Sequence, residues 1–150
     1  MTKPEGTYEG GVGDGSSVSG NEAEFREYWK WGAAGWSNYK CTDGCIIIPA
    51  NNYIGQAIQL IEGQTYTISA QIKSSTGYKI KCGNQIFEGE IKSDKEFVFV
   101  SHTFTITEND FTLTSYDDVK DHVLISIHGS ASDSVTYYLL TLEKGSVATP

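Results

Sequence analysis

The residues best suited to chemistry lie between positions 29 and 53, where large aromatic rings stand close to short amide side chains. Sugars present flat C–H faces that stack on aromatic rings, and hydroxyl groups that pair with short polar side chains. An exposed apolar patch of this kind is also costly in water unless something covers it. We therefore predict that a glycan or a partner protein contacts this region, at these ligand-binding residues: Trp29, Trp31, Tyr39, Asn52 and Tyr53.

The element that carries the two tryptophans decides how they are presented. Trp29 and Trp31 lie two residues apart and share one face if the segment is a strand. A short amphipathic helix over residues 22–31 is the alternative. A second alternative places the two tryptophan rings in the core, because a domain of this size needs large buried side chains.

Catalysis has little support in the sequence. A glycosidase needs two carboxyl groups held roughly 5–10 Å apart in a cleft. Glu88 and Glu90 are candidates, but they alternate out of one face of a predicted strand, as solvated charges do. The chain also has no G-x-S-x-G and no H-E-x-x-H motif. We predict that the protein is not an enzyme.

Metal and cofactor binding are expected to be absent. Residues 116–122 hold three carboxylates, and a structural calcium ion is the alternative there, because calcium takes 6–8 oxygen ligands. The segment lacks the D-x-D-x-D spacing, however, so we predict a solvated loop. His102 falls on the apolar side of its strand and is predicted to be a satisfied core or rim histidine.

The chain has three cysteines, so at least one is unpaired within a monomer. Cys41 and Cys45 flank an Asp-Gly pair, which is a strong signal for a two-residue hairpin turn. We predict buried or free thiols here, and a disulfide across the hairpin is the alternative. Zinc would need a second ligand pair, and only Cys82 and scattered histidines remain.

The composition of the chain argues against two classes of partner, nucleic acids and membranes. The formal net charge of −8 argues against a nucleic-acid surface, which needs a basic face. No apolar run approaches the roughly 20 residues that span a bilayer. The first residues lack the apolar core of a signal peptide. We expect synthesis in a cytoplasm, no nucleic-acid partner and no membrane insertion.

Alternating apolar and polar residues predict the elements that must hold these side chains. In residues 65–73, Tyr66, Ile68, Ala70 and Ile72 face one way and polar residues the other, which is typical of a half-buried antiparallel strand. Further runs of this kind are separated by turn signals such as Glu62-Gly63, Gly83-Asn84 and Ser93-Asp94. Roughly eight to ten strands at this spacing predict an all-β, antiparallel jelly-roll sandwich.

The first 21 residues differ from the rest. They are polar and rich in Gly and Ser, a composition that cannot bury enough apolar surface to offset its ordering entropy. We predict a flexible arm or linker over residues 1–21 and one module over residues 22–150. An arm that pairs with a neighbouring subunit is the alternative.

Two segments resemble a known family. Residues 60–70, with the run Gly63-Gln64-Thr65-Tyr66-Thr67-Ile68-Ser69, and the closing run Leu142-Glu143-Lys144-Gly145-Ser146-Val147-Ala148-Thr149-Pro150, resemble the jelly-roll module of bacteriophage tail and fibre proteins. That module is similar to carbohydrate-binding modules with a galactose-binding-like β-sandwich. The resemblance covers about residues 25–150. It implies binding to a cell-surface glycan or to other virion proteins, and it assigns Trp36 to the core.

The resemblance implies a non-catalytic binding module in a virion, made in the host cytoplasm and present as a homo-oligomer. Two alternatives remain. One is a structural virion protein, such as a head decoration or collar fibre, whose aromatics bury at subunit contacts. The other is a carbohydrate-binding module of a polysaccharide-degrading enzyme, which would be secreted.

Overall fold

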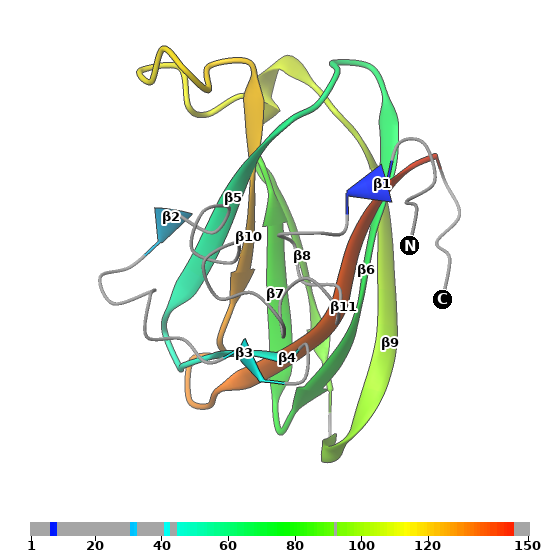
Figure 1. The fold of residues 1–150 in the computed structure, drawn as a ribbon. Coiled ribbons are helices and arrows are strands. Elements are labelled where there is room, and N and C mark those ends of the chain that lie inside the picture. Colours follow the sequence, from blue (N-terminus) through cyan, green and yellow to red (C-terminus); the bar gives the residue numbers. More distant parts are fainter. Residues whose placement is uncertain (1–6, 9–30, 33–40, 43–44, 92, 146–150) are drawn as a thin grey trace.

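The computed structural model describes residues 7–8, 31–32, 41–42, 45–91 and 93–145, and it shows two antiparallel sheets packed face to face (Figure 1). The six-stranded sheet has the order β3-β4-β11-β6-β9, with β1 also paired to β11, and the five-stranded sheet has the order β2-β5-β10-β7-β8. The strands are β1 (Thr7–Tyr8), β2 (Trp31–Gly32), β3 (Cys41–Thr42), β4 (Cys45–Ile48), β5 (Tyr53–Gln59), β6 (Thr65–Ser74), β7 (Gly77–Cys82), β8 (Gln85–Glu90), β9 (Ser93–Thr105), β10 (His122–His128) and β11 (Val135–Lys144).

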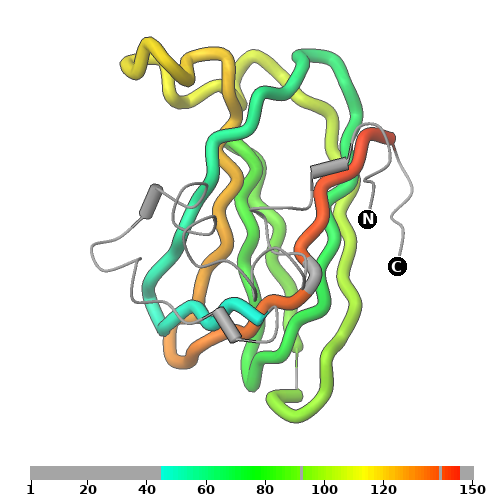
Figure 2. The backbone as a smooth tube through the Cα atoms, viewed as in Figure 1, coloured from blue at the N-terminus to red at the C-terminus, as the bar shows by residue number. Residues whose placement is uncertain are grey.

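The predicted all-β class is confirmed. In the described part of the chain the only helical element is the short 3-10 helix η2 (Glu108–Asp110). It belongs to the connection between β9 and β10, which folds over one end of the sandwich in Figure 2. In the same part of the chain, no helix has the length and apolar character needed to span a bilayer.

The core forms where the inner faces of the two sheets meet, and it is rich in isoleucine. The strand face predicted for β6 is correct: Tyr66, Ile68, Ala70 and Ile72 are all 3% exposed or less. The Tyr66 hydroxyl accepts a hydrogen bond from the Ile61 backbone N–H at 3.2 Å, as a buried tyrosine requires. Thr67 and Ser69, on the opposite face of β6, are buried as well, so this strand is not half-solvated at its centre.

Two of the predicted turns can be compared with the structure. Gly83, between β7 and β8, has φ 62°, and a Cβ there would lie 2.6 Å from the Asp110 side chain, so glycine is required. Ser93-Asp94 stands at the start of β9, where the strand is irregular. Ser93 pairs with Ser74, and the register then shifts so that Val98 pairs with Ile72. The Ser93 Oγ accepts hydrogen bonds from Lys95 N at 3.3 Å and Glu96 N at 3.1 Å, so the chain turns locally within this strand.

Asp110 ties η2 to the five-stranded sheet. Its fully buried carboxylate accepts hydrogen bonds from Thr107 N at 2.8 Å, Asn84 N at 3.0 Å and Gln85 Nε2 at 2.9 Å. A buried carboxylate with several donors is stable in its position, so the β7–β8 turn is fixed to the β9–β10 connection.

The cysteine hairpin forms as predicted in its backbone. Thr42 pairs with Cys45, which is the register that a two-residue turn produces. The Cys41 side chain lies outside the described residues, so the disulfide stays a prediction. Cys82 is a buried free thiol, and burial, with the nearby Asp110 charge, raises its pKa well above the ordinary value.

Of the predicted arm, Thr7 and Tyr8 form β1, which pairs with Glu143 and Leu142 of β11. The other residues of 1–21 lie outside the described part of the chain. So do Trp36 and the segment of the alternative helix up to residue 30. The flexible arm and the boundary at residue 22 therefore stay predictions.

Candidate functional site

The outer face of the five-stranded sheet gathers the polar and aromatic side chains that could bind a ligand. The strand register places Tyr53, His128, Lys79 and Glu88 directly beside one another on β5, β10, β7 and β8. We call these four residues the sheet row. Because successive side chains of a strand alternate between faces, these positions point away from the core that Ile54, Ile127 and Ile80 fill.

Tyr53 and His128 form a stacked pair within the sheet row. Their ring centroids are 5.0 Å apart and the rings are inclined by 21°. His128 Nε2 lies 2.9 Å from the hydroxyl of Ser126, the neighbouring residue on the same face of β10. Each ring is half-buried, so the pair is held by its neighbours but keeps a surface that a ligand could touch.

The electrostatics keep the His128 ring neutral. Burial lowers its pKa to about 4, and the positive charges of Lys79 and Lys81 act in the same direction. At neutral pH the face therefore combines a neutral stacked pair with two lysine ammonium groups. Among the described residues, neither lysine takes part in an ion pair, although Glu88 stands directly opposite Lys79.

The next row of the same face contains a predicted site residue. Trp31 of β2 pairs with Gly55 of β5, which is opposite Ser126 of β10 and, beyond it, Lys81 of β7. The backbone thus brings Trp31 within one row of Tyr53. Trp29 and Tyr39, the remaining predicted aromatics, lie outside the described residues.

Asn52 has a structural part in the turn before β5. Its side-chain amide donates to the Ala50 carbonyl at 2.9 Å, and its backbone carbonyl accepts from Gly129 N at 2.9 Å. The first bond stays within the β4–β5 turn, and the second joins the start of β5 to the end of β10, next to the Tyr53–His128 pair. The backbone of Asn52 thus helps to place the stacked pair.

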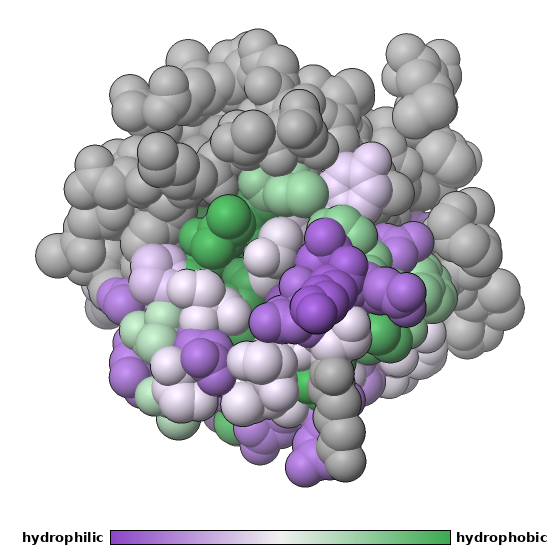
Figure 3. Space-filling model, turned by 90° about the horizontal axis from the view of Figure 1, so that it is seen from below, coloured by the Kyte–Doolittle hydropathy of each residue, from purple (hydrophilic) through white to green (hydrophobic). Residues whose placement is uncertain are grey.

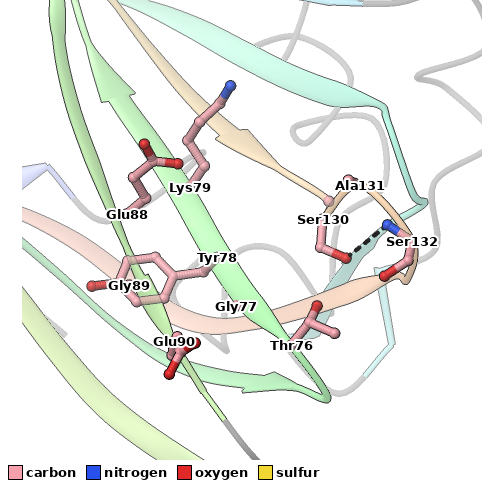
Figure 4. A pocket seen from close by; sticks show the side chains of 11 residues that line it. Thr76, Gly77, Tyr78, Lys79, Glu88, Gly89, Glu90, Ser130, Ala131 and Ser132 are labelled. Atoms are coloured by element: carbon pink, nitrogen blue, oxygen red, sulfur yellow. Dashed lines mark hydrogen bonds between the residues drawn. The ribbon is translucent and has the colours of Figure 1, made fainter.

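A hollow adjoins the sheet row (Figure 4). It has a volume of about 590 Å³ and is open to solvent. Its walls come from the β6–β7 turn, from β7 and β8, and from the β10–β11 loop, with Thr76, Lys79, Glu88, Glu90, Ala131 and Ser132 among the lining residues. Lys79 and Glu88 belong both to the sheet row and to the hollow. Seen from the end at the β6–β7 turn (Figure 3), the described surface mixes hydrophilic and hydrophobic residues.

The loop over the hollow is pre-formed by its own hydrogen bonds. Ser130 Oγ accepts from Asp133 N at 2.8 Å and donates to the Asp133 carbonyl at 3.0 Å. Asn51 Nδ2 donates to the Ala131 carbonyl at 3.0 Å, and Ser75 Oγ donates to Asp133 Oδ2 at 3.0 Å. The loop is thus attached to the β4–β5 and β6–β7 turns.

Other sequence candidates have structural explanations. His102 is a rim histidine, as predicted: its Nε2 lies 2.6 Å from the Tyr78 hydroxyl, and its ring stacks on Phe87 at 4.8 Å. Burial lowers its pKa. The exposed Glu88 and Glu90 lie on one strand face, as predicted. No cluster of three metal-binding side chains occurs within residues 45–91 and 93–145, which include the acidic segment 116–122.

The sequence prediction missed Lys79, His128 and the β10–β11 loop. A signal exists in the sequence, because Lys79 and Lys81 alternate with the apolar Ile80 and Cys82, a pattern that places the two lysines on the outer face of a strand. Nothing in the sequence shows that His128, 75 positions after Tyr53, stacks on it.

The comparisons with known proteins give the fold. No protein-family model and no curated protein matches the chain. A variant of a family 29 carbohydrate-binding module, complexed with cellulohexaose, is 11% identical over 94% of this chain and 93% of its own, with a TM-score of 0.54. A CBM4 structure is 20% identical over 71% and 75%, with a TM-score of 0.52. The C-terminal CBM6 of a laminarinase from Zobellia galactanivorans is 12% identical over 79% and 94%, with a TM-score of 0.50. The chain therefore has the β-sandwich fold of carbohydrate-binding modules.

Proposed function

We propose that this chain is a non-catalytic glycan-binding module whose ligand lies on the outer face of the five-stranded sheet. The observation that carries the proposal is the stacked Tyr53–His128 pair beside Lys79 and Lys81, which form no ion pair among the described residues. Rings offer stacking surfaces to sugar C–H groups, and ammonium groups donate hydrogen bonds to hydroxyl oxygens. The fold supports this proposal, because it is shared with carbohydrate-binding modules.

The direction of the sheet row suggests how a glycan would bind. Neighbouring strands lie about 4.7–4.9 Å apart, a distance comparable to the advance of one sugar unit along a chain. A glycan crossing the strands would meet one side chain of the row per strand: Tyr53, His128, Lys79 and then Glu88. Trp31, at its register position in the next row, would widen the contact.

A shallow, open face of this kind gives weak single-site affinity, around millimolar, or about −4 kcal/mol. Several copies on one particle would raise the effective affinity without new contacts. We therefore propose a homo-oligomer as the working form, with no requirement for a metal or an organic cofactor.

The biological setting rests on separate support. The closing run that ends in Ala148-Thr149-Pro150 favours a phage tail or fibre, with a cell-surface glycan as ligand and the virion as location. The module of a polysaccharide-degrading enzyme is an equally consistent setting, since the CBM6 neighbour is part of a laminarinase. A structural virion protein that binds other subunits would use the same aromatics as buried contacts.

A glycan array with a multimerised form of the protein tests the proposal, with Tyr53→Ala as the site variant and Tyr138→Ala as a control on the other outer face. We expect selective binding that Tyr53→Ala removes and Tyr138→Ala retains. Trp29→Ala with Trp31→Ala tests the other predicted aromatics in the same assay. Failure of the wild type to bind any glycan would contradict the proposal and favour the structural role. Binding to intact bacterial cells, compared with binding to insoluble plant polysaccharide, separates the virion setting from the enzyme setting.

A further inference from the structure

The hollow beside the sheet row suggests which class of glycan the site takes. We infer that the hollow binds a neutral side branch, so that the module recognises a branched polysaccharide rather than a plain linear chain. This inference rests on the proposed function. It adds the substrate class of the same site.

The position of the hollow is the first argument. Lys79 and Glu88 are the last two residues of the sheet row and also line the hollow. A chain that crosses the strands along the row passes the mouth of the hollow at these two side chains. From there the hollow extends along β7 and β8 toward Gly77 and Glu90, at right angles to such a chain (Figure 4). A substituent on the sugar above Lys79 and Glu88 would enter it directly.

The size and rigidity of the hollow are the second argument. Its volume of about 590 Å³ is within the range of small-ligand pockets, roughly 300–1,000 Å³. The hydrogen bonds from Asn51 to Ala131, from Ser75 to Asp133 and within the Ser130–Asp133 turn fix its outer wall before any ligand arrives. A pre-formed wall lowers the ordering cost of binding, so the hollow can distinguish ligands by shape.

The lining chemistry is the third argument. Thr76, Glu88, Glu90 and Ser132 supply oxygen atoms, and Lys79 supplies N–H donors. Sugar hydroxyls both donate and accept, so they can pair with both kinds of group. The Lys79 and Glu88 charges oppose each other, and no second lysine or arginine is among the lining residues. An acidic branch would therefore gain no net ionic attraction there, which is why the inference specifies a neutral one.

The test uses matched pairs of oligosaccharides with a common backbone. Cellohexaose is compared with a xyloglucan oligosaccharide, mannohexaose with a galactosylated mannan oligosaccharide, and xylohexaose with an arabinosylated and a glucuronosylated xylan oligosaccharide. Affinities are measured by isothermal titration or by affinity electrophoresis. We expect at least a tenfold preference for the neutral branched member of one pair, and weaker binding of the glucuronosylated member than of its neutral counterpart.

Two matched variants assign the preference to the hollow. Ala131→Leu adds bulk to the lining without removing a side-chain hydrogen bond, and Ser134→Leu adds similar bulk to an exposed position of the same loop outside the lining. We expect Ala131→Leu to remove the preference for the branched ligand and to leave the affinity for the linear ligand unchanged. Ser134→Leu should behave as the wild type. Unchanged melting temperatures confirm that both variants are folded.

The outcomes separate the two proposals. Equal binding of linear and branched members by the wild type overturns the branch inference and leaves the glycan-binding function standing. A branch preference that survives Ala131→Leu places the branch elsewhere and also overturns it. Equal affinity for acidic and neutral branches overturns the requirement for neutrality. If no oligosaccharide of the panel binds, the branch inference fails for these backbones, and the glycan array decides separately whether the proposed function stands.

Discussion

The two outer faces of the sandwich each carry a pair of rings and a lysine, but they differ in how these side chains are engaged. The six-stranded sheet also presents an aromatic pair beside a lysine: Phe97 and Tyr138 have ring centroids 5.5 Å apart. There, however, the Lys73 ammonium lies over the Phe97 ring, 4.3 Å from its centroid. On the five-stranded sheet, Lys79 and Lys81 stand beside the Tyr53–His128 pair with no ion pair or ring contact among the described residues.

The threonine hydroxyl groups of the six-stranded sheet are engaged as well. On the six-stranded sheet, Thr65 and Thr105 are linked by a 2.9 Å hydrogen bond, and Thr67 bonds both to Thr103 at 2.9 Å and to the Gly145 carbonyl at 2.8 Å. These groups satisfy one another. A binding face must instead keep donors and acceptors available for the ligand. Residue types alone therefore do not distinguish the two faces, whereas the state of the lysine side chains does.

The largest expected effect tests the core that both faces share. Ile68→Ala removes a fully buried side chain from β6 and should lower the free energy of unfolding by about 2–5 kcal/mol. Gln71→Ala, on the outer face of the same strand, should change it by less than about 0.5 kcal/mol. Chemical denaturation of both variants measures this. Comparable losses in the free energy of unfolding would mean that Gln71 on the outer face contributes as much to stability as Ile68 in the core.

Next in size is the loss of the stacked ring. Tyr53→Ala should weaken glycan binding about tenfold, or about 1.4 kcal/mol, because the ligand loses an aromatic surface. Tyr138→Ala removes a similar ring from the other face and should leave affinity unchanged. Titration calorimetry with a glycan selected on the array provides the measurement. A tenfold loss in the Tyr138 variant would reverse the assignment of the two faces.

A smaller effect is expected from the lysines. Lys79→Gln should weaken glycan binding by about 0.5–1.5 kcal/mol, the net contribution of one hydrogen bond to a ligand. Lys73→Gln should not change affinity but should lower stability by about 0.5–1 kcal/mol, because the contact with Phe97 is lost. Equal losses of glycan affinity in Lys79→Gln and Lys73→Gln would mean that both outer faces contact the ligand.

An effect of similar size concerns pH. The folded pKa of His128 is about 4, below the unfolded value near 6.5, so the unfolded state binds more protons between these values. Stability should therefore fall as pH decreases from about 6.5 to about 4. Because the ring is only half-buried, solvent screening limits the change to about 1 kcal/mol, or a few degrees in Tm.

His128→Gln should flatten that part of the stability profile. His102, whose pKa burial also lowers, contributes to the remaining slope in this variant. Thermal melts at closely spaced pH values distinguish the two profiles. If stability depends on pH in His128→Gln as it does in the wild type, the position of His128 on the face does not lower its pKa.

Alternation along the chain was enough to predict the class of fold and the inner face of β6. Each side chain of a strand alternates with its neighbour, so Tyr66, Ile68, Ala70 and Ile72 had to share a face, and the apolar face had to be buried. The Asp-Gly pair also predicted the β3–β4 hairpin, since its register depends only on local turn geometry. These features follow from interactions between residues close in sequence.

The candidate site depended on tertiary structure. Tyr53 was predicted as a ligand-binding residue from its type, but its partner His128 and the adjacent Lys79 come from other strands, joined to β5 by the pairing of β10. The hollow needs the β6–β7 turn and the β10–β11 loop, more than 50 positions apart, to meet at one end of the sheet. The sequence by itself determined the inner face of a regularly alternating strand such as β6, but not that of β11, where a register shift after Tyr138 leaves Tyr137 buried. Only the strand order, which long-range pairing of the sheets decides, determined which outward residues stand together.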